Sequence, residues 1–295
     1  MGRLGDDTKT EDHLDSIESF DVLSDERRMR ILLALSDEMR DDHKSPSLQF
    51  SELRKQAGIR DTGNFNYHLN KLRDELFVEK TDDGYHLTPI GLKTVGTVLA
   101  SSYQGEASRE MDVSDDCPLC GGGLNATYEK GILRVKCTNH PDDHIFENLM
   151  PLGGIEGKTT DEVMGLMTIA TRYYMELALE NTCPICYGKI DVGLRTTEDD
   201  EMPYMVGTVC DRCGARIEFP VRACITRYPD VISFYHDHGI NIRESPYWAP
   251  DFWETGSVEI ISENPLRLQV TLSVDDDKLE LLLDDNADIV EVENA

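Results

Sequence analysis

The chain has 295 residues, of which 39% are hydrophobic, so it is long enough for two or three domains with packed cores. Its formal net charge is −28, from 57 Asp and Glu against 29 Lys and Arg, which ordinarily argues against a nucleic-acid partner. No apolar run approaches the roughly 18 to 20 residues that span a bilayer, and the N-terminus has no apolar signal segment. We therefore expect a cytoplasmic protein with no membrane partner.

The negative charge is unevenly distributed. Residues 21–80 contain 11 Lys and Arg against 12 Asp and Glu, a balance of −1, so almost all of the excess lies elsewhere. An acidic excess this widespread resembles the proteins of salt-accumulating halophilic archaea. At about 1 M salt the Debye length is about 3 Å, so the acidic remainder of the chain would hardly repel DNA.

The first 60 residues favour short helices. Apolar spacing predicts two linked helices over 14–38, with a break at Ser24. Residues 48–50 favour a short strand, after which Ser51 caps a short helix that Gly58 ends.

Residues 60–76 have a clear helical pattern. Either Asp61 or Thr62 can serve as its N-cap. The apolar positions of one face are Phe65, Leu69, Leu72 and Leu76. His68 lies at the flank of that face, so we expect it to pack against a neighbouring helix.

Two β-prone runs then flank Asp83-Gly84, which indicates a hairpin. Thr88 and Pro89 start another helix that reaches about Tyr103. The order helix, helix, helix, hairpin, helix is typical of a winged helix–turn–helix domain, here over 14–103.

Residues 14–103 resemble the ArsR-type winged-helix regulators, especially their haloarchaeal members. Four segments carry the resemblance: L-S-D-E-R-R-M-R-I-L (23–32), F-S-E-L-R-K (50–55), F-N-Y-H-L-N-K-L (65–72) and D-D-G-Y-H-L-T-P-I-G (82–91). It implies a homodimer on double-stranded DNA, with the first and last helices pairing the subunits. The metal-sensing members carry cysteines around the helix–turn–helix. This chain has none there, so that sensing site is absent.

The polar face of residues 60–76 suits a DNA major groove. We expect base-edge contacts from Thr62, Asn64, Tyr67 and Asn70. We expect phosphate contacts from Arg60, Lys71 and, at the wing, Lys80. Gly63 would let the duplex approach the backbone closely.

Residues 104–116 have little periodicity and are interpreted as a linker, after which all eight cysteines occur. The first predicted zinc set, in a zinc ribbon over 117–157, is Cys117, Cys120, Cys137 and His140, with His144 in reserve. The second, in a ribbon over 183–228, is Cys183, Cys186, Cys210 and Cys213. Paired C-x-x-C spacing in a cytosolic chain favours tetrahedral zinc over disulfides, and four ligands per site indicate two structural ions. Cys224 is left over and is expected to be a buried thiol.

The rest of the chain completes an α+β fold. A helix with a Thr159/Glu162 capping box connects the ribbons over 158–182. Residues 229–295 are predicted to form a helix and an antiparallel β-meander.

These features favour a sequence-specific transcription regulator whose C-terminal part contacts an effector or a protein. The alternative is a zinc-ribbon adaptor that binds a protein of the transcription machinery. No nucleophile–base constellation, H-E-x-x-H or catalytic H-x-E is present, so we do not expect an enzyme.

Overall fold

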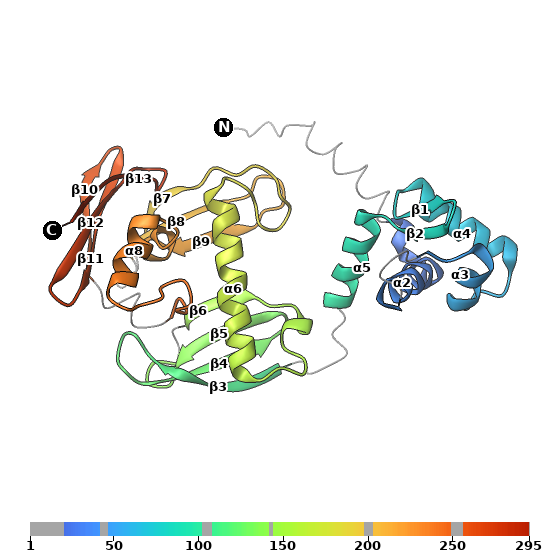
Figure 1. The fold of residues 1–295 in the computed structure, drawn as a ribbon, viewed down its shortest axis with the longest axis horizontal. Helices are drawn as coiled ribbons and strands as arrows, with labels where there is room; N and C mark the ends of the chain where they lie inside the picture. The colour runs from blue at the N-terminus through green and yellow to red at the C-terminus, as the bar shows by residue number, and fades with distance from the viewer. Residues whose placement is uncertain are drawn as a thin grey trace, which may run out of the picture. The chain divides into compact units, whose positions relative to one another are not determined.

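The computed structural model describes residues 21–41, 47–101, 108–141, 144–197, 203–248 and 256–294. It divides into two compact units, Met1–Ser102 and Tyr103–Ala295. Both units combine helices with antiparallel strands, which confirms the α+β class (Figure 1). Among the described residues, no helix is both long and apolar enough to cross a bilayer.

The first unit is mostly helical. Its elements are η1 (Val22–Ser24), α2 (Glu26–Asp41), α3 (Phe50–Gln56), α4 (Thr62–Asp74), β1 (Val78–Thr81), β2 (Gly84–Leu87) and α5 (Pro89–Ser101). The predicted apolar face of α4 is confirmed for Phe65, Leu69 and Leu72, which are fully buried against α2 and α3. It is wrong for Leu76, which is 63% exposed, because α4 ends at Asp74 and Leu76 takes a left-handed backbone conformation with φ of 59°.

Local boundaries in the first unit differ from the predictions. Gln49, rather than Ser51, is the N-cap residue of α3, and the strand over 48–50 is a single bridge between Leu48 and Tyr85. Thr81 pairs with Gly84, so the hairpin turns through the two residues between them, one position earlier than predicted. The predicted helical residues 14–20 lie outside the described part of the chain.

The second unit begins with a four-stranded antiparallel sheet. Its strands, in spatial order, are β3 (Ser108–Asp116), β4 (Gly123–Glu129), β5 (Ile132–Cys137) and β6 (His144–Leu149). The prediction of a linker over 104–116 is therefore wrong for 108–116. Strand β3 alternates regularly in burial, but two of its inward positions are polar, which hides the period. Arg109 there donates to the carbonyls of Ile155 and Lys158, and Asp115 accepts from Trp248.

A long helix, α6 (Thr160–Leu179), follows the short η2 (Leu152–Gly154). Its predicted capping box is confirmed, because Thr159 and Glu162 exchange side-chain and backbone hydrogen bonds. The helix belongs to two cores. Val163 and Met167 pack with β3–β6, whereas Met175 and Ala178 pack with the elements that follow (Figure 1).

Two further sheets complete the second unit. One contains β7 (Gly193–Thr196), β8 (Tyr204–Val209) and β9 (Arg216–Pro220), followed by α7 (Val221–Ile225) and α8 (Pro229–Asp237). The other is the predicted meander, β10 (Ser257–Glu263), β11 (Leu266–Val274), β12 (Asp277–Leu283) and β13 (Ile289–Asn294), in sequential order. Alternate leucines of β11 and β12, such as Leu268 and Leu281, are buried in the core that also holds Cys183 and Cys210.

Candidate metal centres and nucleic-acid interface

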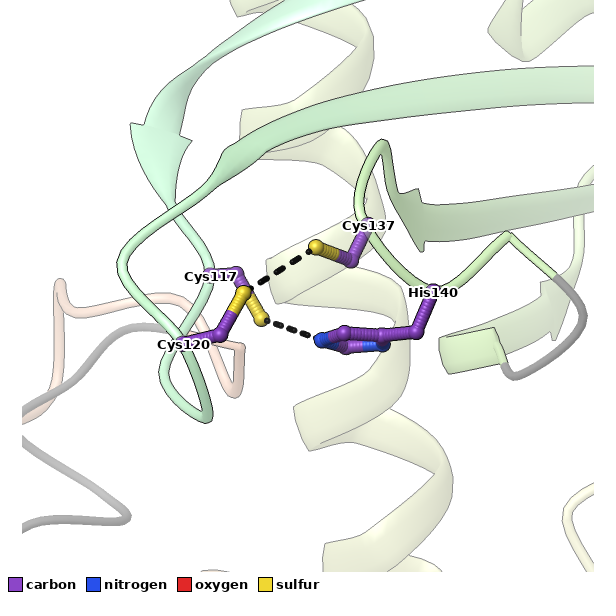
Figure 2. Close-up of side chains that lie close together, drawn as sticks. All are labelled: Cys117, Cys120, Cys137 and His140. Carbon is purple, nitrogen blue, oxygen red and sulfur yellow. Dashed lines mark hydrogen bonds between the residues drawn. The ribbon is translucent and has the colours of Figure 1, made fainter.

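The first predicted metal set converges at one end of the β3–β6 sheet. Cys117 follows β3 and Cys137 ends β5, so strand pairing brings the two halves of the set together (Figure 2). The Sγ atom of Cys117 lies 3.4 Å from Nε2 of His140, and the Sγ atoms of Cys120 and Cys137 are 3.5 Å apart. All four ligand atoms lie within 4.8 Å of one another, so these residues could hold a metal ion.

The second set is built in the same way from the loops before β7 and before β9. The Sγ atoms of Cys183 and Cys213 are 3.7 Å apart, and so are those of Cys186 and Cys210. These four atoms also lie within 4.8 Å of one another.

Three of the loops share one backbone turn. The N–H groups of Cys117, Cys183 and Cys210 donate to the carbonyl five residues later, at 2.7, 2.8 and 2.9 Å. The N–H four residues later donates back to the cysteine carbonyl. That fourth residue is left-handed each time: Gly121 at φ of 66°, Gly214 at 74°, and Tyr187 at 58°. The shared turn explains why the short C-x-x-C spacing aims both thiols inward.

The donor chemistry of both clusters fits a tetrahedral ion. Thiolates about 2.3 Å from zinc lie about 3.8 Å apart, close to the observed sulfur separations. Hydrogen bonding from the backbone N–H of Gly122, then from Asn139, lowers the pKa of Cys120 to about 6. Hydrogen bonding from the backbone N–H of Cys213 lowers the pKa of Cys210 to about 7. Both thiols thus ionise readily to the form that binds metal. Their neighbours are shifted the other way: burial raises the pKa of Cys117, and, against a lowering hydrogen bond from the backbone of Ala215, burial and the adjacent thiols raise the pKa of Cys213 to about 12.

Other candidate ligands lie apart from these clusters. Cys224 is 1% exposed, and burial raises the pKa of its thiol far above the usual range, which confirms the expected buried thiol. The side chain of His144 lies outside the described residues. His238 sits at the end of α8, where Nδ1 is 2.8 Å from the carbonyl of Phe234 and Nε2 is 3.2 Å from Asp277.

The predicted DNA-contacting residues lie on or beside α4, except for Lys80 on β1. Asp61 is the N-cap, and its carboxylate accepts from the backbone N–H of Asn64 at 2.5 Å. The exposed members of the set are Arg60, Thr62, Gly63, Tyr67, Lys71 and Lys80, whereas Asn64 and Asn70 are half-buried. A Cβ on Gly63 would meet only Asp61, at an ordinary 3.5 Å, so the fold itself does not require glycine there.

Several of these side chains already have partners within the first unit. Asn64 accepts from Arg27 of α2 at 3.1 Å, and Asn70 accepts from Arg73 at 3.3 Å. The ammonium of Lys80 lies 5.6 Å from the ring centroid of Tyr85. Sequence reasoning missed Arg27, because no spacing rule links it to a residue on α4.

His68 is 3% exposed and packs against α2, as predicted. Its Nε2 atom lies 3.2 Å from Nη1 of Arg27. Burial lowers the pKa of His68, so the ring is neutral near pH 7.

Comparison with known proteins divides the chain at the same place as the structure. Residues 16–98 match a family model described as "Domain of unknown function (DUF7347)", and residues 114–289 match one described as "Domain of unknown function (DUF7351)". The search found no matching curated protein. No solved structure matched either. Since the second family model spans more than half of the sequence, the chain belongs to the DUF7351 family.

Proposed function

We propose that this protein is a dimeric, sequence-specific DNA-binding transcription regulator with a winged helix–turn–helix domain and two structural zinc ions. The observation that carries the proposal is the exposed polar face of α4. Its outward side chains, including Tyr67 and Lys71, combine hydrogen-bonding groups with a cation, and the β1–β2 hairpin adds Lys80. Such a helix can read base edges while cations hold phosphate.

The N-terminus of α4 favours the same role. The side chain of Asp61 satisfies one free backbone N–H, and the next residues, Thr62 and Gly63, are exposed. Because the Asp61 carboxylate repels phosphate, the exposed hydroxyl of Thr62 suits a base edge better than the DNA backbone.

Exposed apolar side chains on α5 support a homodimer. Gly91 and Val95 of this helix are buried, Val95 in the core of the first unit. Four large side chains on it are exposed by 39–53%: Ile90, Leu92, Val98 and Leu99. Soluble proteins rarely leave such a group uncovered, and a second copy would bury it. A twofold dimer would then present two α4 helices to successive half-sites.

Zinc is the ion that the donor sets favour. Four thiolates, or three thiolates and an imidazole, are the common closed tetrahedral sets for zinc, and such sites stabilise the fold. The ligands Cys183 and Cys210 are buried in a core with β11 and β12, so an ion there would hold that core together.

A protein-binding adaptor is the second candidate. Exposed apolar side chains occur at the second metal cluster and beside it on α6: Ile169, Tyr173, Ile185 and Tyr187. The hydroxyls of Tyr173 and Tyr187 are 2.5 Å apart, which ties this surface together. Zinc-binding loops with exposed apolar residues suit protein contacts.

Binding to duplex DNA tests the leading proposal. The full-length, zinc-loaded chain should select particular duplexes from a randomised pool, measured from low salt to molar KCl because phosphate contacts weaken with salt. Asn70→Ala should lose about 1–3 kcal/mol of discrimination at one base pair while keeping both metals. Asn286→Ala, the same change in an exposed turn of the second unit, is the control. If the chain binds duplexes without any sequence preference, the proposal of a sequence-specific regulator is contradicted and the protein-binding adaptor is the remaining candidate.

A further inference from the structure

Arg27 connects the start of α2 to α4 through a single nitrogen atom. Its Nη1 lies 3.1 Å from Oδ1 of Asn64 and 3.2 Å from Nε2 of His68. A guanidinium Nη1 carries two hydrogens and never accepts, so one hydrogen goes to each partner. The arginine side chain is half-exposed, and its other end is held near Asp25, 3.8 Å from Nε.

This arrangement determines which ring nitrogen of His68 carries the proton and which way the side-chain amide of Asn64 is turned. Since arginine only donates, Nε2 of His68 must be the unprotonated nitrogen, and the proton sits on Nδ1. Nδ1 is buried and has no hydrogen-bond partner among the described residues, and the carboxylate of Asp25 lies 3.9 Å from it. For the same reason, the amide of Asn64 must turn its oxygen toward Arg27. Within the described part of the chain its Nδ2 group has no acceptor, so Asn64 offers donors to an incoming ligand.

Asn70, the other predicted base-reading amide, is oriented in the same sense. Its Oδ1 accepts from Nη1 of Arg73, one turn further along α4. Both amides thus have an arginine on the oxygen and an NH₂ group with no acceptor among the residues that the structure describes. An unconstrained Asn pairs with adenine by donating to N7 and accepting from N6, which requires both amide groups to face the base edge. An amide oxygen has two lone pairs and Arg27 uses one of them, so what the contact sets is the direction of the oxygen, which is turned toward α2.

We propose that Arg27 sets the base preference of α4, because by holding the oxygen of Asn64 it leaves a donor that selects guanine over adenine. The proposal rests on the DNA binding proposed above. Guanine presents two acceptors in the major groove, N7 and O6, which match the two hydrogens of Nδ2. Adenine presents one acceptor and one donor, so its N6 group faces the Nδ2 donor for as long as the Asn64 oxygen stays turned toward Arg27.

The test is duplex selection with the full-length, zinc-loaded protein, followed by affinity measurements on guanine- and adenine-substituted sites. Asn64→Ala identifies the base pair that residue 64 reads. There, the wild type should prefer guanine over adenine by about tenfold, as one good base contact gives. Arg27→Met should reduce that ratio at least about fivefold, because the amide can then rotate. Arg30→Met is the matched control, because it removes the same charge from the same helix. The side chain of Arg30 is 52% exposed and that of Arg27 is 50% exposed, but Arg30 pairs with Glu26 and not with a residue of α4.

Two results overturn the proposal while leaving DNA reading intact: a wild-type preference for adenine at that base pair, or equal ratios for Arg27→Met and Arg30→Met. If the wild-type protein shows no sequence preference at all, the proposed function is contradicted as well. Nitrogen-15 NMR of the wild-type protein tests the geometry even if Arg27→Met fails to fold. It should show neutral His68 with its proton on Nδ1, and a proton on Nε2 contradicts the arrangement.

Discussion

Replacing Cys213 by serine should release one of the two proposed zinc ions and unfold much of the second unit. Cys213 is exposed, so without a metal the change would alter the free energy of unfolding by only about 0.5 kcal/mol. A structural zinc site contributes about 10–16 kcal/mol to folding. Losing even about 3 kcal/mol of that lowers the melting temperature of a unit of this size by about 6–12 °C. Metal content should fall from two ions per chain to one.

The assay combines elemental analysis of the purified chain with thermal unfolding followed by circular dichroism. Cys224→Ala is the matched control, since it removes a thiol buried in the same core that belongs to neither cluster. It should keep two ions, with a modest loss of stability from the small cavity. If Cys213→Ser keeps two ions and melts within 2 °C of the wild type, about the shift that 0.5 kcal/mol produces, the ligand assignment is refuted.

Three further outcomes are expected. Cys120→Ser should shift the fluorescence of Trp248 to longer wavelength, because this 1%-exposed indole packs in the core of the first metal set. The measurement uses a chain whose other tryptophan is replaced by phenylalanine. If the emission of Trp248 does not shift, that packing is contradicted. Leu69→Ala should lower the stability of the first unit by about 2–5 kcal/mol in urea titration, and a loss below about 1 kcal/mol would mean that the site is not a packed core. The carbonyl at Nδ1 and then Asp277 raise the pKa of His238 above 6.5, so its stabilising effect is complete below about pH 6.5 and is lost as pH rises through the raised pKa. Asp277→Asn should therefore flatten the decline in urea midpoint between pH 6 and 8, and an unchanged decline would exclude this pair as its source.

The features that were predictable from sequence are those with a local period or spacing. The C-x-x-C pairs identified both metal sets because two-residue spacers determine the turn, whatever surrounds it. The helical repeat of Phe65, Leu69 and Leu72 identified the buried face of α4. The same repeat failed at Leu76, since the pattern continues past Asp74, where the backbone turns left-handed.

The features that were not predictable depend on partners distant in sequence. Strand β3 reads as irregular because Arg109 and Asp115 occupy inward positions, and only the distant carbonyl of Ile155 and the indole of Trp248 make those positions acceptable. Likewise, Arg27 lies 37 residues from Asn64, and no local rule connects them. Both the strand β3 and the contact between Arg27 and Asn64 therefore depend on polar pairs between residues far apart in the sequence.

Helix α6 gives the second unit an order of assembly during synthesis. Every ligand of the first metal set precedes this helix, and every ligand of the second set follows it. Domains form as they leave the ribosome, N-terminal parts first. The first sheet, its metal set and Val163 of α6 can therefore come together while the second set is still unsynthesised. The other end of the helix, with Met175, belongs to a core that is complete only when β11 and β12 have emerged. Trp248 closes the first core from a position made after the second metal set but before β11 and β12, so the first core is complete only once the ligands of the second set have emerged.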